Sequence, residues 1–305
     1  MPRPALAASR AIDILNFMAA APARGYSLTD LVRALDLNPA SCHALLNAMT
    51  RDGYLVRQPR GRTYQLGPAL IAIGQGALQC HPLVAAARER IGPLSAELDL
   101  DCLLTARVDD RLIALASAGP GRQPGLRVGQ RVPMIPPLGT PFLAWADEAE
   151  VESWLARAPA GVEPVRLRES LAVVRQHGFA VTLRSPQQGA AELAVLDLAD
   201  EPFADARQRQ AAEAIGRMGD AYLMIDALPD RLYPVDLISA PVFDGAGAVV
   251  CTLSLFGFDR PLSLKRITLL GNSLIRDCRM AANALTAKDA GMLNMVGMGD
   301  AECAL

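Results

Sequence analysis

Residues 27–66 read SLTDLVRALDLNPASCHALLNAMTRDGYLVRQPRGRTYQL, and this stretch decides how the N-terminal part of the chain folds. It contains a short amphipathic segment, a turn, a second amphipathic segment, and two β-prone runs around an Arg/Gly tip. That order predicts a helix-turn-helix followed by a two-stranded wing. We expect a support helix over 9–20 to precede it, capped by Ser9 and ended before Pro22.

The first helix of the pair should begin near Ser27 or Thr29, because either side chain can accept a hydrogen bond from a free N–H of the first turn. Its apolar residues recur at helical spacing and predict an inward face. That face consists of Leu28, Leu31, Val32 and Leu35.

The second helix of the pair carries the residues that we expect to read DNA. Asn38 is a suitable N-cap, Pro39 suits the first helical position, and Gly53 ends the helix. At about 100° per residue, its side chains divide into two faces. The apolar face holds Cys42, Leu45, Leu46 and Met49, and the opposite face holds Ala40, His43, Ala44, Asn47 and Arg51.

Small or hydrogen-bonding side chains near a helix N-terminus suit the major groove, which is about 12 Å wide. We therefore predict base-edge contacts from Ala40, Ser41, His43 and Asn47, and a phosphate contact from Arg51. The alternative is the solvated polar face of an ordinary amphipathic helix.

The predicted wing places Arg57, Arg60 and Arg62 near its tip, with no acidic residue among them. Such a tip would bind phosphates or enter the minor groove, with an affinity that salt weakens. Taken alone it would be an ordinary hairpin with a solvated basic turn. Its place directly after the helix pair favours the DNA-binding interpretation.

The charge distribution supports a nucleic-acid partner for the N-terminal part alone. Residues 1–66 hold eight arginines and four aspartates, a net charge of +4, whereas the whole 305-residue chain carries −2 and the remainder therefore −6. A basic unit attached to an acidic one fits a DNA-binding module on a larger domain that stays off DNA.

The remaining composition points to a protein of the cytoplasm with buried, reduced thiols. Six cysteines are scattered without a C-x-x-C or a neighbouring His pattern, so neither a disulfide framework nor a metal site is expected, and no cofactor. The first residues lack the apolar core of a signal peptide. No run of about 20 apolar residues predicts a membrane span.

Beyond a winged helix-turn-helix domain at 1–67, the pattern predicts a linker helix over 68–82, an α+β domain over 83–288 and a flexible tail over 289–305. The linker helix is apolar over much of its surface, so it should pack against something, such as a second copy of itself. In the larger domain we expect helices at 83–99, 140–157, 166–177, 204–224 and 263–287. Strands are expected at 101–108, 111–117, 125–132, 178–184, 191–198, 235–243 and 247–256.

Four segments together resemble the IclR-type family of bacterial transcription regulators. They are SRAIDILNFMA (9–19), the helix pair through LLNAMTRDGYL (45–55), RVPMIPPLGTPFLAWA (131–146) and LISAPVFDGAGAVVCTLSLFG (237–257), within a resemblance that covers most of residues 8–286. It implies a winged helix-turn-helix, a linker helix and a GAF-like α/β effector domain. It further implies a homodimer or homotetramer on double-stranded DNA, controlled by a small, usually anionic, organic effector.

Two departures from the family pattern affect the implied effector site. Leu138-Gly139-Thr140-Pro141 replaces a Gly/Ala/Lys-rich helix opening, and an insertion of about fifty residues (185–234) separates two segments that usually lie close in sequence. Asp236 follows the place of the acidic turn, and Ser254 matches a pocket-lining position. The implied effector-binding residues are Leu138, Gly139, Thr140, Asp236 and Ser254.

Three functions are open at this point. The first is a ligand-controlled transcription regulator, in which two states of the larger domain change the spacing of the DNA-binding units. The second is a regulator whose larger domain is only an oligomerisation scaffold. The third is an enzyme that uses Cys102, Cys251 or His177, although no catalytic arrangement in the sequence supports it and a catalytic site is not expected.

Overall fold

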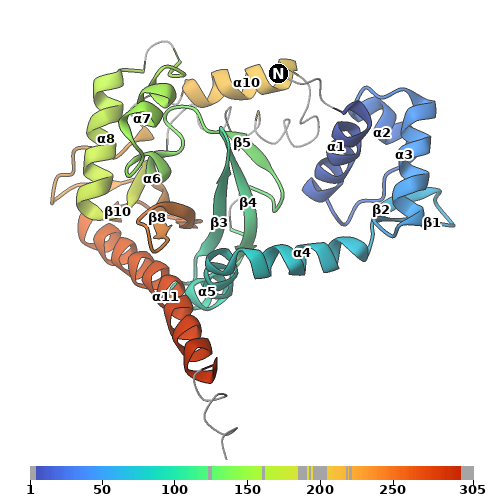
Figure 1. Ribbon diagram of the computed structural model, residues 1–305. Coiled ribbons are helices and arrows are strands. Elements are labelled where there is room, and N and C mark those ends of the chain that lie inside the picture. The colour runs from blue at the N-terminus through green and yellow to red at the C-terminus, as the bar shows by residue number, and fades with distance from the viewer. Residues whose placement is uncertain are drawn as a thin grey trace, which may run out of the picture.

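The computed structural model describes residues 5–122, 126–159, 162–184, 191, 194, 205–217, 219 and 222–296. A small N-terminal unit (5–67, the head) and a larger sheet-containing unit (82–296, the body) are joined by one helix (Figure 1). The fold is α+β, as the sequence predicts.

The head consists of α1 (Leu6–Ala20), α2 (Leu28–Ala34), α3 (Pro39–Arg51) and the antiparallel hairpin of β1 (Leu55–Gln58) and β2 (Thr63–Leu66). Apolar side chains from all of these elements form one core, with Ile14, Leu31, Leu46 and Leu55 almost fully buried. Burial of such side chains, at about 25 cal/mol per Å² of apolar surface, holds short helices that would not persist alone.

Local capping sets the helix starts of the head. Ser27 caps α2: its hydroxyl accepts from the Asp30 N–H (3.2 Å), and Asp30 Oδ2 accepts from the Ser27 N–H (2.8 Å). Asn38 caps α3 and Pro39 occupies its first position, as predicted. The helix predicted at 9–20 is present and ends at Ala20, but its predicted start is wrong, because α1 begins at Leu6 without a side-chain cap and Ser9 lies inside it.

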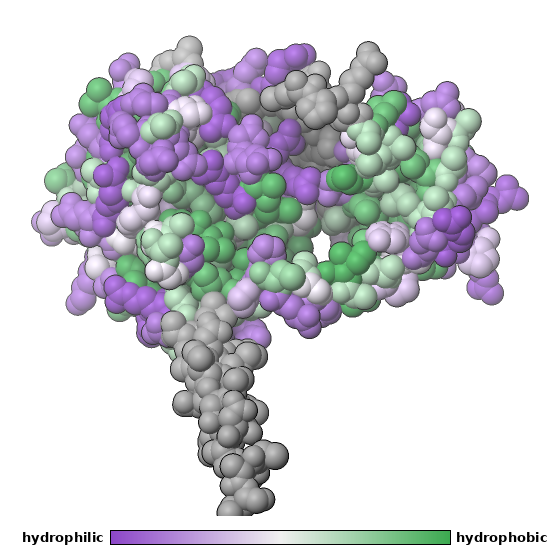
Figure 2. Space-filling model, viewed as in Figure 1, coloured by the Kyte–Doolittle hydropathy of each residue, from purple (hydrophilic) through white to green (hydrophobic). Residues whose placement is uncertain are grey.

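The linker helix α4 (Ala69–Cys80) has no buried residue. Ile71 is 68% exposed and Ile73 is 49% exposed. Figure 2 shows hydrophobic surface along α4, between the head and the body. No single helix in the described ranges has the length and apolar character to cross a bilayer. Only α4 and α5 (Pro82–Leu98) together reach them, and these two meet at a 107° bend.

The body contains a sheet in the order β5-β4-β3-β9-β8-β6, with every neighbouring pair antiparallel. The strands are β3 (Asp101–Val108), β4 (Arg111–Ala118), β5 (Arg131–Pro133), β6 (Ala180–Leu183), β8 (Val235–Phe243) and β9 (Val249–Phe256). A separate pair joins β7 (Leu232–Tyr233) to β10 (Leu262–Ser263).

Helices cover both faces of this sheet (Figure 1). On one face α5 and α11 (Leu264–Val296) pack over a core that includes Leu104, Ala240 and Leu253. On the other, α6 (Thr140–Leu143), α7 (Glu148–Leu155), α8 (Pro164–His177) and α10 (Asp205–Gly216) contribute to a second core around Trp154.

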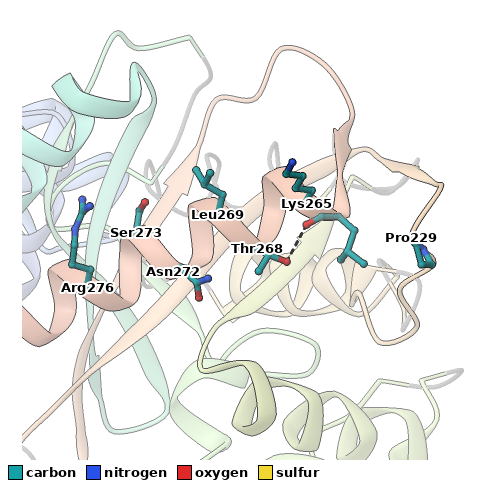
Figure 3. Close-up of a pocket in the computed structure, with 8 residues that line it drawn as sticks. Pro229, Lys265, Thr268, Leu269, Asn272, Ser273 and Arg276 are labelled. Carbon is teal, nitrogen blue, oxygen red and sulfur yellow. Dashed lines mark hydrogen bonds between the residues drawn. The ribbon is translucent and has the colours of Figure 1, made fainter.

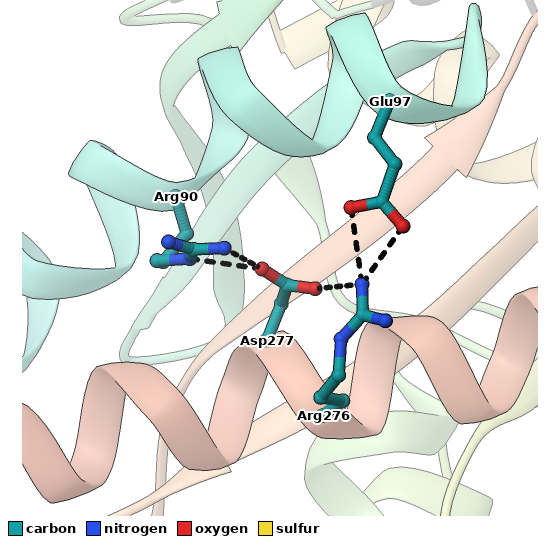
Figure 4. Close-up of polar contacts among 4 residues, drawn as sticks. All are labelled: Arg90, Glu97, Arg276 and Asp277. Atoms are coloured by element: carbon teal, nitrogen blue, oxygen red, sulfur yellow. Dashed lines mark hydrogen bonds and ion pairs between the residues drawn. The ribbon is translucent and has the colours of Figure 1, made fainter.

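An ion-pair network fastens α5 to α11 (Figure 4). The fully buried Asp277 carboxylate accepts from Arg90 Nε and Nη2 (2.8 and 2.5 Å) and from Arg276 Nη2 (3.2 Å). Arg276 also reaches Glu97 (3.1 Å). A buried carboxylate is tolerated here because charged donors surround it.

Several predicted elements of the body differ from the observed ones. The helix expected at 140–157 is broken into α6 and α7, because Asp147 starts a new helix by accepting from the Glu150 N–H (2.8 Å). In place of the strand expected at 125–132, the structure has the three-residue strand β5, which begins at Arg131. The helix expected at 204–224 ends at Gly216.

Two further predictions fall partly outside the described residues. Of the strand expected at 191–198, only Ala191 and Ala194 are described, and both are helical and buried. The final helix, expected to end at 287, continues to Val296. Residues 297–305 are outside the described ranges.

Candidate nucleic-acid interface and ligand site

The two faces of α3 divide as the sequence predicts. Cys42, Leu46 and Met49 are buried in the head, and Leu45 is half-buried. The opposite side is exposed at Ala40, His43, Ala44, Asn47 and Arg51, with Ser41 half-buried at its margin. In Figure 1, α3 and the hairpin lie at the outer edge of the head, away from the body. A duplex can therefore approach them without meeting the body.

The hydrogen bonds at the start of α3 fix the residues expected nearest the bases. Asn38 Oδ1 accepts from the Ala40 and Ser41 N–H groups (3.0 and 3.3 Å), which holds the first turn in place. One turn later, Asn47 Nδ2 lies 3.3 Å from His43 Nδ1. The amide and imidazole thus present a joined set of donors and acceptors on the exposed side.

Arg51 has a partner that the sequence pattern did not predict. Its Nε and Nη2 bind the two carboxylate oxygens of Asp52 (2.9 and 3.1 Å), and its side chain is 77% exposed. This hydrogen-bonded pair raises the pKa of Arg51 and lowers the pKa of Asp52. Arg51 must therefore exchange Asp52 for a phosphate if it contacts DNA.

The wing carries its positive charge without neutralisation. Arg57, Arg60 and Arg62 are all exposed, and no ion pair joins them to a carboxylate in the described part of the chain. Arg57 lies over the Tyr64 ring (5.9 Å to the centroid), and Arg62 holds the turn at a φ of 49°. Tyr26 and Tyr64 exchange two backbone hydrogen bonds (3.0 and 2.7 Å), which tie the hairpin to the start of α2.

The ligand residues implied by the resemblance come from two parts of the body. Ser254 lies on β9 with its Oγ 2.8 Å from that of Ser239 on the paired strand β8. The short helix α6, which follows Leu138 and Gly139, packs on these same strands. Its first residue, Thr140, is buried. Thus the structure brings the Leu138–Thr140 segment and Ser254 to one side of the sheet.

Asp236 lies near the start of β8, three residues before Ser239. It is the extra residue of a bulge in β8, between the partners of Thr182 and Leu183 on β6. Phe243 lies at the opposite end of β8, and its ring contacts Trp145, which follows α6 (centroids 5.0 Å apart).

Sequence reasoning missed three hydroxyl residues near Ser254. Ser239 pairs with it directly, and Thr105 Oγ1 lies 2.6 Å from Thr252 Oγ1 on the adjacent strands β3 and β9. All four hydroxyl side chains are buried, on the side of the sheet opposite Leu253 and its core. Alternation of polar and apolar residues within β9 was the available signal.

The N-terminus of α6 is less suited to binding an anion than the sequence suggests. The helix has four residues, Pro141 has no N–H, and the Phe142 and Leu143 N–H groups already bind the Gly139 carbonyl (2.9 and 3.0 Å). A short helix has little macrodipole. Gly139 has a φ of 99°, and a Cβ there would lie 2.5 Å from Met134 Cγ, so glycine is required.

A different hollow lies on the outer side of α11 (Figure 3). It has a volume of about 750 Å³ and is lined by Pro229, Leu264, Lys265, Thr268, Leu269, Asn272, Ser273 and Arg276. None of the five residues implied for effector binding is among them. It is a groove at the surface rather than an interior site.

The residues considered for catalysis lie in unsuitable surroundings. Cys102 and Cys251 are buried, and burial raises the pKa of each thiol to about 12. Such thiols carry almost no thiolate at neutral pH and are poor nucleophiles. His177 is exposed at the end of α8, with its ring beside Phe179. Among the described residues no group of His, Cys, Asp or Glu could hold a metal ion.

Comparisons with known proteins agree with this arrangement. Residues 7–59 match the model of the IclR helix-turn-helix domain. Over 253 residues the chain is 26% identical to the glycerol operon regulatory protein of Streptomyces griseus, covering 79% of this chain and 93% of that protein.

Solved structures extend the likeness to the whole fold. An IclR transcriptional regulator from Alicyclobacillus acidocaldarius has 20% identity and a TM-score of 0.65, covering 92% of this chain and 99% of that one. An IclR homologue from Microbacterium hydrocarbonoxydans, crystallised with 4-hydroxybenzoate, has 17% identity and a TM-score of 0.59, covering 92% and 99%.

A basic winged helix-turn-helix joined to an α+β body, with these relatives, defines a DNA-binding transcription regulator. Its helix-turn-helix domain is of the IclR type, and the chain as a whole is similar to IclR-type regulators in sequence and in fold.

Proposed function

We propose that this regulator recognises a specific operator by placing α3 in the major groove while the wing arginines bind flanking phosphates. This proposal rests on the exposed side of α3 and on three wing arginines that form no ion pair with the described residues. His43 and Asn47 would contact base edges, and Ala40 and Ser41 allow close approach. Arg57, Arg60 and Arg62 would supply affinity that does not depend on sequence.

Salt-dependent binding of an Arg60→Ala, Arg62→Ala double variant tests the role of the wing. Loss of two phosphate contacts should weaken binding to operator and random DNA alike and reduce the salt slope by about 2. Fluorescence anisotropy across a salt series measures both. Arg175→Ala, which removes an exposed arginine from α8, is the matched control and should leave the slope unchanged. An unchanged slope in the double variant would remove the wing from the interface.

We further propose that the body binds a small organic carboxylate between the Leu138–Thr140 segment and the hydroxyl-bearing side of β8 and β9. The packing of α6 on these strands and the buried Ser239–Ser254 pair support it. The 4-hydroxybenzoate bound by a structural relative has the expected chemistry, a carboxylate and a hydroxyl on a small apolar frame. A ligand would exchange its own hydrogen bonds for those between the hydroxyls.

Thermal shifts with a panel of aromatic and aliphatic carboxylates, including 4-hydroxybenzoate, test this site. A ligand that binds the folded state raises the melting temperature, and Ser254→Ala should reduce that rise. The Ser239–Ser254 and Thr105–Thr252 pairs also satisfy one another without a ligand. This observation favours the second candidate, a body that acts only as an oligomerisation scaffold. A melting temperature that stays the same with every ligand of the panel would support the scaffold.

A further inference from the structure

One side of α1 faces away from the core of the head and is nevertheless half-buried. Asp13, Asn16 and Ala19 recur at three-residue spacing, which places them on one stripe of the helix. The head core lies on the other side of α1, at Ile14, Phe17 and Met18. Something outside the head core must therefore cover this stripe.

The body covers it with the segment that leads into β5. A Cβ built on Gly129 would lie 3.2 Å from Ala19 Cβ, so the two backbones are in direct contact at this point. Gly129 has a φ of 86°, which favours glycine and lets the segment approach closely.

Opposite charges influence each other across the contact at the other end of the stripe, without forming an ion pair. Burial raises the pKa of Asp13, while the positive charge of Arg131 on β5 acts in the opposite direction. Burial and the nearby Arg111 lower the pKa of Arg131, and Asp13 opposes that shift. Asn16 Nδ2 and Arg131 Nε are both buried without a hydrogen-bond partner among the described residues. The contact thus removes polar groups from water at both of its sides.

The covering segment is hydrogen-bonded to β4 and continuous with the proposed ligand site. The Gly129 N–H binds the Ala114 carbonyl (2.7 Å), and the Ala114 N–H binds the Gln130 carbonyl (3.0 Å). After Arg131, Val132 and Met134 are buried in the core that also includes Leu138. Met134 is the residue against which Gly139 packs.

We propose that the α1 stripe of Asp13, Asn16 and Ala19 is a docking surface for residues 129–131 of the same chain. The contact holds the head in one posture relative to the body while α3 and the wing stay accessible. Undocking changes the posture and hence operator affinity, which gives the body a route to the DNA-binding unit. The inference of changed operator affinity rests on the proposed DNA-binding function, but the contact does not.

A disulfide cross-link tests the contact without DNA. Ala19→Cys and Gly129→Cys are combined in a background carrying Cys80→Ser and Cys303→Ser, which leaves the buried native cysteines in place. We expect mild oxidation to give a reducible band of altered mobility at monomer mass. Ala19→Cys with Gly245→Cys, at an open position, is the matched control and should stay reduced. A dimer band, or no cross-link beyond the control, would overturn docking within one chain.

A charge exchange tests the contact without the strained glycine position. Asp13→Arg and Arg131→Asp should each increase hydrogen exchange of the amides of 127–131, and the double variant should restore protection. Operator binding should follow, with a coupling of about fivefold between the two changes. Asp36→Arg adds the same charge to the head at an exposed position and controls for non-specific attraction.

The outcomes separate the two proposals. Unchanged exchange and additive effects in the charge series, together with intact operator binding, would overturn the docking surface and leave the proposed DNA recognition standing. A cross-link and restored protection in a protein that binds no DNA would support the docking surface and contradict the proposed recognition.

Discussion

Single residues before α2 and α3 determine where these two helices of the head begin. Ser27 and Asn38 satisfy the free N–H groups of the first turns, and both roles are evident from the sequence because capping acts over three residues. Arg51 shows the limit of such reasoning. Its pairing with the adjacent Asp52 depends on side-chain conformations that the helical pattern does not specify.

Asn47→Ala should reduce discrimination between operator and random DNA by about 1–3 kcal/mol, because a lost base-edge contact affects only the specific complex. Competition binding at fixed salt measures the ratio of the two affinities. Gln176→Ala, at an exposed position of α8, serves as the polar-to-alanine control. Equal losses on both DNAs would assign Asn47 to the phosphate backbone.

Ser27→Ala should destabilise the head by about 1 kcal/mol, the usual cost of losing an N-cap. Urea unfolding followed through a probe in the head measures it. Ser9→Ala is the matched control, because Ser9 lies within α1 and does not cap it.

The same variant has a second readout. Hydrogen bonds from Ser27 lower the pKa of Asp30, so the stabilisation is present above the ordinary aspartate pKa and is lost as pH falls through the lowered value. In Ser27→Ala the Asp30 pKa, measured by NMR titration, should rise. A pKa that stays low would show that Ser27 is not its main cause.

At the scale of elements, the linker helix α4 leaves its apolar side chains exposed. It buries none of its residues, although Ile71 and Ile73 are among the largest exposed apolar side chains. A helix that is apolar over much of its surface requires a partner. We infer that this partner is α4 of a second copy, which would also pair two heads.

Ile71→Asp combined with Ile73→Asp should raise the dissociation constant of the oligomer at least about tenfold. Because these residues lie on opposite sides of α4, one of the two new carboxylates would be buried without a partner whichever side packs. Sedimentation velocity over a concentration series measures the shift. Ala172→Asp with Gln176→Asp adds the same charge to exposed positions of α8, away from the linker helix, and should have a smaller effect. Equal behaviour of the two variants would place the interface elsewhere.

At the scale of the whole molecule, the packing of α5 on α11 holds the body together and anchors the linker helix. Asp277→Ala should lower the free energy of unfolding by about 3 kcal/mol. This is the low end of the cost of breaking a buried ion pair, because Arg90 retains some contact with solvent. Chemical denaturation measures it, with Asp230→Ala, at an exposed position, as control. A loss as small as that of the control would mean that the network contributes no net stability.

The proportion of the fold that could be predicted differs between the two units. In the head, helical periodicity and caps specify nearly every element, since each depends on neighbours a few residues away. In the body, the break after α6 and the shortness of β5 were missed, because a continuous apolar pattern does not reveal where a chain turns. The helical state of Ala191 and Ala194 was missed for the same reason.

The candidate site divides in the same way. The exposed side of α3 follows from the 100° rotation per residue, a property of the chain alone. The Ser239–Ser254 and Thr105–Thr252 pairs arise only when distant strands align, and strand register is a tertiary property. Asp236, which is assigned to the ligand site from its place in the sequence, is the extra residue of a bulge in β8, and a bulge too depends on how two strands pair.

By itself, the sequence determined that a basic winged helix-turn-helix precedes an α+β domain, and which side of α3 stays exposed. These properties depend on local hydrogen bonds and on the spacing of apolar residues. Only the tertiary structure decided that Ala19 lies against Gly129 and that four hydroxyls lie on one side of the sheet. Such contacts depend on how separate elements pack, which no periodicity within one element encodes.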